Sequence, residues 1–89
     1  MNTKRLGLDR EHAREILKGF ISNNSDLKPN EITDDLVIFE TVGEEGFHAI
    51  RHWVEEYSSV SDLSVHFVSL KKVTVRQILE CFWEVAEVV

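Results

Sequence analysis

Two histidines four residues apart offer the clearest chemistry in this chain. His48 and His52 would lie on one face of a helix, so both imidazoles could reach one divalent metal ion. Glu44 and Glu55 lie close enough on that surface to assist. A firmly held metal needs a fixed third and fourth ligand, and the spacing supplies none. We therefore expect a solvated polar face and no metal site.

The single cysteine does not belong to a recognisable catalytic group. Cys81 falls beside Phe82 on an apolar stripe, and no basic neighbour would lower the pKa of its thiol, so we expect it to be buried and inert. No nucleophile and base are spaced so that they would pair. We expect no enzymatic activity and no cofactor. A lone thiol forms no internal disulfide and suits a reducing cytosol.

Size and charge narrow the class of protein. The 89 residues, 43% of them apolar, predict one folded domain over residues 1–89. A net charge of −6 makes nucleic acid an unsuitable partner, because phosphate binding needs a concentrated basic face. The longest apolar run, residues 36–39, is far shorter than the ~20 residues that span a membrane, and residues 1–8 lack the apolar core of a secretory signal. We expect a soluble cytoplasmic protein without membrane contact.

Residues 41–57 predict the helix around which the domain is built. Thr41 and Glu44 have the spacing of a capping box, so this helix is expected to begin at Thr41. Apolar residues recur at three- and four-residue steps along one stripe: Phe47, Ile50, Trp53, Val54 and Tyr57. The outer face carries charged and polar side chains: Glu44, Glu45, His48, Arg51, His52 and Glu55.

Two further helices are expected. The first follows the N-cap residue Asp9 and ends at Asn23. Its apolar stripe is Ala13, Ile16, Leu17, Phe20 and Ile21, and its opposite face carries Arg10, Arg14 and Lys18. The last begins after Thr74, which has capping-box spacing with Gln77. Its stripe is Val75, Ile78, Leu79, Phe82, Val85, Ala86 and Val89. Trp53 and Trp83 are expected to be core aromatics.

The connections between these helices are irregular. Residues 26–40 contain apolar side chains without a helical period, so we expect a long loop packed across the helices. Residues 63–67 alternate like a strand, and residues 68–75 keep a high β-propensity. Pairing with residues 36–41 would give a short two-stranded β structure. We favour the alternative, an irregular stretch with one helical turn that starts at Ser61. The expected fold is all-α, a small bundle of three to four helices with a long first loop.

Acidic residues gather in the middle of the chain. From residue 26 to residue 62 there are ten acids against two bases, Lys28 and Arg51. The central helix should therefore present a negative surface that attracts a protein partner with a basic surface. We assign the docking to acidic residues, with histidine and arginine tuning which partner fits: Glu40, Glu44, Glu45 and Glu55, then His48, Arg51 and His52.

The order of these elements resembles that of acyl carrier proteins. Ile32-Thr33-Asp34-Asp35-Leu36 is similar to the family's approach to its central helix, and Val73-Thr74-Val75-Arg76-Gln77-Ile78-Leu79 to the opening of its last helix. The chain looks most like a bacterial acyl-carrier-like family of unknown function, whose central helix opens Gly-Asp-Asp-Ala and ends with two aromatics four residues apart. The corresponding residues here are Gly43-Glu44-Glu45-Gly46, Trp53 and Tyr57. The resemblance covers most of the chain from about residue 11 and implies a small acyl-carrier-like helical bundle.

The chain departs from carriers at the residue that gives them their chemistry. Their Asp-Ser-Leu motif supplies a serine hydroxyl for a phosphopantetheine arm, whereas this chain has Val42 and Gly43 at the aspartate and serine positions. Glycine has no hydroxyl to modify, but it allows a tight turn at the helix start. The resemblance therefore implies a non-catalytic interaction domain without a cofactor. Two alternatives stay open: a genuine phosphopantetheine-dependent carrier with its serine elsewhere, and an acidic immunity- or inhibitor-type protein that blocks a basic enzyme.

Overall fold

The described part of the chain consists of helices and the loops that connect them. The computed structural model describes residues 9–83. In chain order the elements are α1 (Arg10–Asn23), η1 (Pro29–Glu31), α2 (Ile38–Tyr57), α3 (Leu63–His66), η2 (Leu70–Lys72) and α4 (Val75–Leu79), where η marks a 3-10 helix. Residues 9–83 contain no β-strand, so the predicted all-α class is confirmed. None of the helices in this range is long and apolar enough to cross a membrane.

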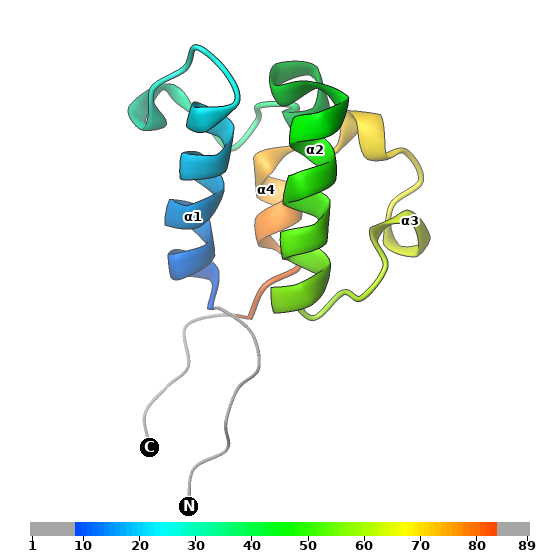
Figure 1. Ribbon diagram of the computed structural model, residues 1–89. Helices are drawn as coiled ribbons and strands as arrows, with labels where there is room; N and C mark the ends of the chain where they lie inside the picture. Colours follow the sequence, from blue (N-terminus) through cyan, green and yellow to red (C-terminus); the bar gives the residue numbers. More distant parts are fainter. Residues whose placement is uncertain (1–8, 84–89) are drawn as a thin grey trace, which may run out of the picture.

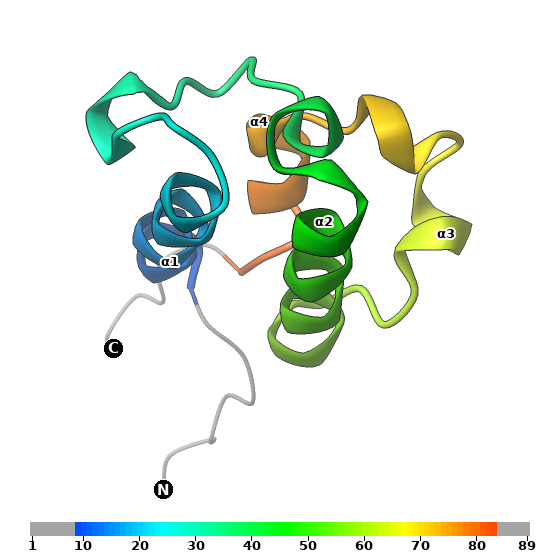
Figure 2. The ribbon, with the colours of Figure 1, turned by 45° about the horizontal axis from the view of Figure 1, so that its top comes forward.

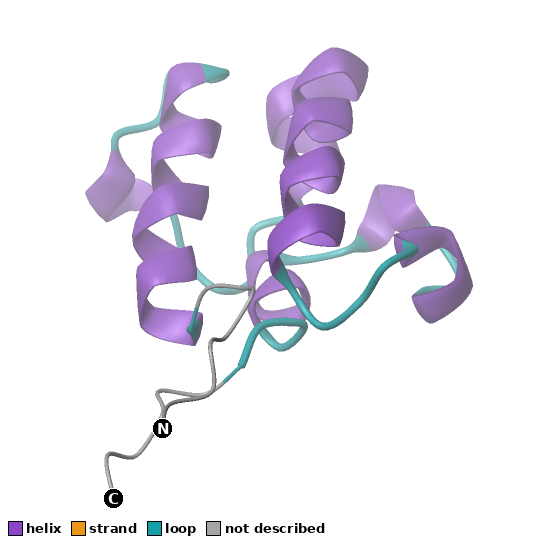
Figure 3. Cartoon of the chain, turned by 60° about the horizontal axis from the view of Figure 1, so that its bottom comes forward, coloured by secondary structure: helices purple, strands orange, loops and turns teal. Residues whose placement is uncertain are grey.

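The two long helices lie side by side, and α4 packs between them. Figure 1 shows α1 next to α2 with α4 behind the gap, and Figure 2 shows the same arrangement with the top turned forward. Helix α3 and η2 lie on the side of α2 that faces away from α1, as Figure 3 shows from below. One side of α2 therefore contributes to the core with α1 and α4, and the other borders the α3–η2 segment.

One continuous apolar core joins these elements, and Trp53 lies within it. Its ring centroid is 5.4 Å from that of Phe20 on α1 and 4.9 Å from that of Phe82, which follows α4. Burying a large apolar side chain contributes about 1.5–3 kcal/mol. The buried residues are Ala13, Leu17, Ile21, Ile32, Ile38, Phe47, Ile50, Trp53, Val54, Leu63, Val73, Val75, Ile78, Leu79, Cys81 and Phe82.

Most of the predicted stripe residues face this core, and two of them are exposed at its margin. Ile16 on α1 and Tyr57 at the end of α2 are 38% and 40% exposed. Trp83 is half-buried, so it is less of a core residue than predicted. The apolar pattern identified the correct helix faces but not how far α4 and the loops cover their edges.

Helix α1 begins and ends where the sequence predicts. The carboxylate of Asp9 accepts a hydrogen bond from the His12 N–H at 2.9 Å, which satisfies one of the free donors at the helix start. That hydrogen bond is the main reason why the pKa of Asp9 is lowered. The helix ends at Asn23, next to polar residues that bond locally.

The last helix starts as predicted but is much shorter. Thr74 and Gln77 form the expected capping box, in which each side chain bonds the other residue's backbone N–H. Helix α4 then ends at Leu79, whereas the predicted stripe continued along the chain. Its last members lie outside the described residues: Val85, Ala86 and Val89.

Arg10 helps to explain why α4 ends early. The sequence placed Arg10 on the outer face of α1, but its guanidinium donates to the carbonyl oxygens of Leu79 at 3.1 Å and Phe82 at 3.3 Å. The hydroxyl of Ser59 donates to the carbonyl of Cys81 at 2.6 Å. Carbonyls that would accept helical N–H groups are thus bound by side chains from other elements. The prediction for Arg10 was wrong because its partners are distant in sequence.

The long first connection packs against the helices, as predicted. Ile32 in its middle is buried. The carboxylate of Asp34 accepts from Arg14 of α1 at 2.7 Å, and its backbone carbonyl accepts from the Arg76 N–H of α4 at 2.9 Å. The loop is therefore fixed to two different helices and is an ordered part of the domain.

Residues 63–75 adopt the favoured alternative. The stretch is irregular apart from two short turns, α3 and the 3-10 helix η2. The α-helical turn begins at Leu63 behind the N-cap Asp62 and not at Ser61. The two-stranded pairing is reduced to one isolated antiparallel bridge between Val37 and Thr74. The β-type alternation in the sequence therefore does not produce a strand here.

Candidate functional site

Gly43 divides α2 into two parts. Its φ of 81° and ψ of 179° interrupt the helix, leaving a first turn at residues 38–42 and a longer part at residues 44–57. Glycine adopts a positive φ without the steric cost that a Cβ would bring, so the predicted tight turn at Gly43 is confirmed. The turn brings Val42 close to Gly46, where an added Cβ would lie 2.8 Å from the Val42 Cβ. Both glycines therefore serve the same bend.

The capping box predicted from Thr41 and Glu44 does not form. Helix α2 begins at Ile38, so Thr41 lies inside its first turn. The Thr41 hydroxyl donates to the Val37 carbonyl at 3.0 Å, a bond that threonine commonly makes to the residue four positions earlier. Glu44 is instead the first residue after the bend at Gly43. The sequence pattern was therefore correct in placing a helix start near Glu44, but wrong about the residue that makes it.

Five of the seven residues predicted to dock a partner are exposed on α2. They are Glu40, Glu44, Glu45, His48 and His52. The three glutamates lie on either side of the bend at Gly43, which is itself exposed. The start of the long part of α2 thus presents negative charge to solvent. We call Glu40, Glu44 and Glu45 the acidic surface of α2.

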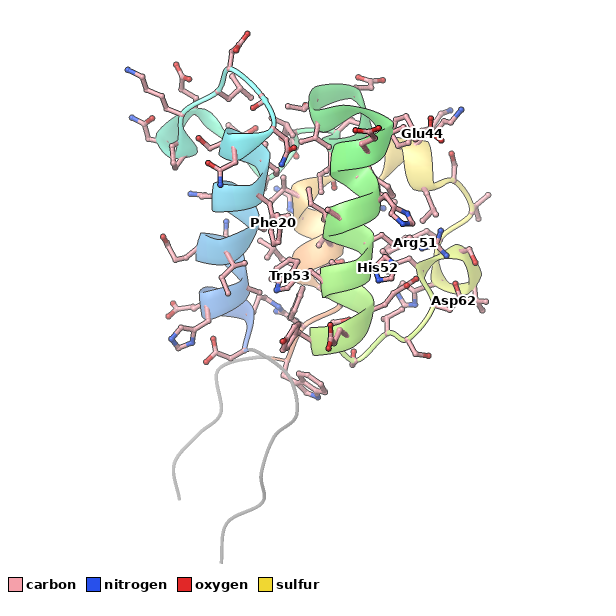
Figure 4. The ribbon with its side chains drawn as sticks, viewed as in Figure 1. Phe20, Glu44, Arg51, His52, Trp53 and Asp62 are labelled. Atoms are coloured by element: carbon pink, nitrogen blue, oxygen red, sulfur yellow. The ribbon has the colours of Figure 1, made fainter. Side chains whose placement is uncertain are left out.

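Arg51 and Glu55, the other two predicted docking residues, bind within the molecule. Arg51 Nε donates to Glu55 Oε2 at 2.9 Å, and its Nη2 donates to Asp62 Oδ1 at 3.2 Å. The Leu63 N–H donates to Glu55 Oε2 at 2.8 Å. Figure 4 shows Arg51 and Asp62 together on the side of α2 that faces α3, away from Trp53. The structure therefore gives this pair a role in holding α3 against α2.

Hydrogen bonds keep both carboxylates of this network ionised. Burial acts to raise the pKa of Glu55, but the bonds from Arg51 and the Leu63 N–H together hold the pKa below its ordinary value. Hydrogen bonds from Ser64 are the main reason why the pKa of Asp62 is lowered. The pKa of Arg51 is raised, chiefly by its bond to Glu55. The network is therefore fully charged at neutral pH.

A groove of about 250 Å³ runs between α2 and η2. Its apolar part includes Phe39 and Phe47, whose ring centroids are 5.4 Å apart. The Lys71 ammonium lies 5.6 Å from the Phe39 ring centroid, within the range of a cation–π contact. The remaining lining residues are Glu44, His48, Arg51 and Leu70. The contact between Lys71 and Phe39 depends on tertiary packing, so the sequence alone does not reveal it.

The two histidines on α2 are in direct contact. The ring centroids of His48 and His52 are 4.9 Å apart, with 73° between the ring planes. Of the other histidines, His12 bonds to Asp9 at 3.0 Å, and His66 lies on α3. Within the part of the chain that the structure describes, no three histidine, cysteine, aspartate or glutamate side chains are placed to hold a metal ion together.

Cys81 is buried, as predicted. Its side chain is within reach of the Gln77 carbonyl, with 3.5 Å between sulfur and oxygen. Burial raises the pKa of the thiol to about 11, so the thiol stays protonated at neutral pH. Because the thiolate is the reactive form, Cys81 is not a nucleophile in this fold.

Comparison with known proteins does not extend these observations. The chain matches no protein-family model, no curated protein and no solved structure.

Proposed function

We propose that this protein is a non-catalytic, acyl-carrier-like interaction domain that docks a basic protein partner through the acidic surface of α2. One observation carries the proposal: Gly43, which the resemblance aligns with the serine of carriers, lies at an exposed bend in α2. The bend is bordered by Glu40, Glu44 and Glu45. A carrier-type helix without its hydroxyl keeps the surface that partners recognise and lacks the group that carries a substrate.

The arrangement of elements supports the acyl-carrier-like part of the proposal. Helix α1 is followed by a long packed loop, the long helix α2, short α3 and η2, and then α4. This is the order that the sequence resemblance implies. The bend at Gly43 begins the long part of α2, where a carrier would hold its prosthetic group. The resemblance thus aligns the serine of carriers with Gly43, which has no hydroxyl.

The charges of α2 support a basic partner. Arg51 is paired with Glu55 and Asp62, so its charge is neutralised within the domain. Glu40, Glu44 and Glu45 remain exposed, and the chain as a whole has a charge of −6. Exposed like charges speed association with an oppositely charged surface and fix its orientation. The same negative charge argues against binding of nucleic acid. The single free thiol, Cys81, suits a cytoplasmic location.

Intact-mass measurement tests the loss of carrier chemistry. After co-expression with a phosphopantetheinyl transferase, we expect the chain to keep its unmodified mass, because Gly43 offers no hydroxyl. A true carrier protein in the same cells serves as the positive control. A mass gain of one phosphopantetheine would overturn the proposal and favour the genuine-carrier alternative, and peptide mapping would identify the serine.

Charge reversal on α2 tests the docking surface. The double variant Glu44→Lys, Glu45→Lys should keep the circular dichroism of the wild type but lose its partner in affinity capture, and the salt dependence of that binding should weaken. Glu11→Lys with Glu15→Lys is the matched control, because it changes the same charge at exposed positions of α1.

The variants that lose partner binding, and the identity of the captured protein, distinguish between the hypotheses. Loss of the partner in the α2 variant but not in the α1 control would support the acidic surface, whereas equal loss in both would show that only net charge matters. Capture of fatty-acid or polyketide enzymes fits a carrier-like domain. Capture of a nuclease or toxin would favour the immunity-type alternative.

A further inference from the structure

We propose that His48 and His52 together chelate one divalent transition-metal ion of the nickel or zinc type on the exposed face of α2. The two residues are one helical turn apart on the long part of α2, so their side chains project in the same direction. Both are exposed, so an ion can reach them without opening the core. The sequence-based expectation of a polar face without a metal concerned a firmly held ion, which needs a third and a fourth protein ligand. An exchangeable ion needs only two imidazoles.

The separation of the two rings fits chelation. Metal–nitrogen bonds of about 2.0–2.1 Å and angles of about 90–110° at the metal place the centroids of two bound imidazoles roughly 4.5–5.2 Å apart. The observed separation of the His48 and His52 centroids is 4.9 Å. The 73° between the ring planes is compatible with this, because a bound imidazole can rotate about its metal–nitrogen bond. The two rings are therefore already at the separation that chelation requires.

The charged groups around the two rings permit a cation. Arg51 is next to His52, but its guanidinium is held by Glu55 and Asp62, which neutralise it. Glu44, one turn before His48, lines the same groove and adds negative charge. From η2, Lys71 lines that groove as well, but its ammonium lies over the Phe39 ring. The nearby carboxylates thus outnumber the cations.

The chemistry of the donors selects the ion. Imidazole nitrogens suit zinc, nickel and copper, whereas magnesium and calcium prefer oxygen ligands. Because no third histidine, cysteine or carboxylate of residues 9–83 is placed to join the pair, water would fill the other coordination positions. The ion is therefore expected to exchange readily and to keep open positions, unlike a structural zinc ion with four protein ligands.

Calorimetric titration of the full chain with nickel or zinc chloride near neutral pH tests the proposal. We expect one ion per chain, no binding of magnesium, and affinity weakened roughly tenfold or more in both His48→Gln and His52→Gln, because each variant leaves a single imidazole. The other two histidines of the chain supply matched controls: His12→Gln and His66→Gln should bind like the wild type. Nickel should also raise the thermal midpoint of the wild type but not that of His48→Gln or His52→Gln, because an ion that needs two aligned rings binds the folded state.

The proposal would be overturned by the absence of saturable binding, or by binding that survives unchanged in His48→Gln or His52→Gln. Several weak sites, lost equally with any of the four histidines, would also overturn it. Circular dichroism of each variant guards against misfolding, which is not expected because both side chains are exposed. The test is independent of the partner proposed above, since it needs only the chain and the metal.

Discussion

Replacing Trp53 with alanine should lower the free energy of unfolding by about 3–5 kcal/mol, the range for large core aromatics. The Trp53 side chain is 9% exposed. It contacts Phe20 of α1 and Phe82 beyond α4, so its removal opens a cavity where three segments meet. A domain of this size has a total stability of only about 5–10 kcal/mol. The variant should therefore be partly unfolded at physiological temperature.

Chemical denaturation followed by far-ultraviolet circular dichroism measures this loss. Tyr57→Ala is the matched control, because Tyr57 lies on the same stripe of α2 but is 40% exposed, and it should cost only about 1 kcal/mol. If the two variants were equally stable, Trp53 would not join α1, α2 and the segment after α4, and the described core would be wrong.

Signals that lie within a few residues of one another were sufficient to predict the helix starts of α1 and α4. Asp9 caps α1 through the N–H three residues on, and Thr74 forms its capping box with Gln77. Each of these interactions is complete within one turn, so no tertiary information is needed. The apolar stripes were predictable for the same reason, since helical period alone sets which side chains share a face.

The start of α2 and the end of α4 could not be predicted locally. Thr41 and Glu44 have capping-box spacing, but α2 already begins at Ile38, and its long part begins after Gly43, the one residue of 9–83 with a positive φ. Helix α4 ends at Leu79 where Arg10, 69 residues away in the sequence, bonds to a terminal carbonyl. In both places a competing interaction decides between patterns that the sequence permits equally.

The sequence was sufficient to predict which residues lie on the outer face of α2. It was not sufficient to predict which of them bind within the molecule. Helical spacing correctly placed Glu44, His48 and His52 together on the exposed side of α2. The same spacing could not distinguish them from Arg51 and Glu55, because the partners that fix this pair come from the α3 segment. Tertiary contacts thus determine which acidic residues are available to a partner. Variants of those residues, and not of Arg51 or Glu55, test docking.

Glu55→Ala should lower the free energy of unfolding by about 2 kcal/mol near neutral pH, as expected when charged hydrogen bonds are lost. One carboxylate oxygen accepts both from Arg51 Nε and from the Leu63 N–H, so the variant leaves two donors without their acceptor. The Glu55 side chain is only 22% exposed, so water replaces those bonds incompletely. Glu56→Ala, at the exposed neighbouring position, is the matched control and should change stability by less than about 0.5 kcal/mol.

The effect of Glu55→Ala should depend on pH in a direction fixed by the lowered pKa. A carboxyl whose pKa is lower in the folded than in the unfolded state stabilises the fold above its ordinary value of 4.5, and this stabilisation disappears as the pH falls through the folded pKa. Urea unfolding should therefore show a gap in stability between wild type and variant at neutral pH, and this gap should close as the pH falls below 4.5. A gap that stays constant would mean that Glu55 acts through packing of its methylene groups. A closing gap would show that the charge of Glu55 stabilises the fold. Loss of partner binding in Glu55→Ala would then report the unfolding of α3. Charge reversal at Glu44 and Glu45, in contrast, reports docking itself.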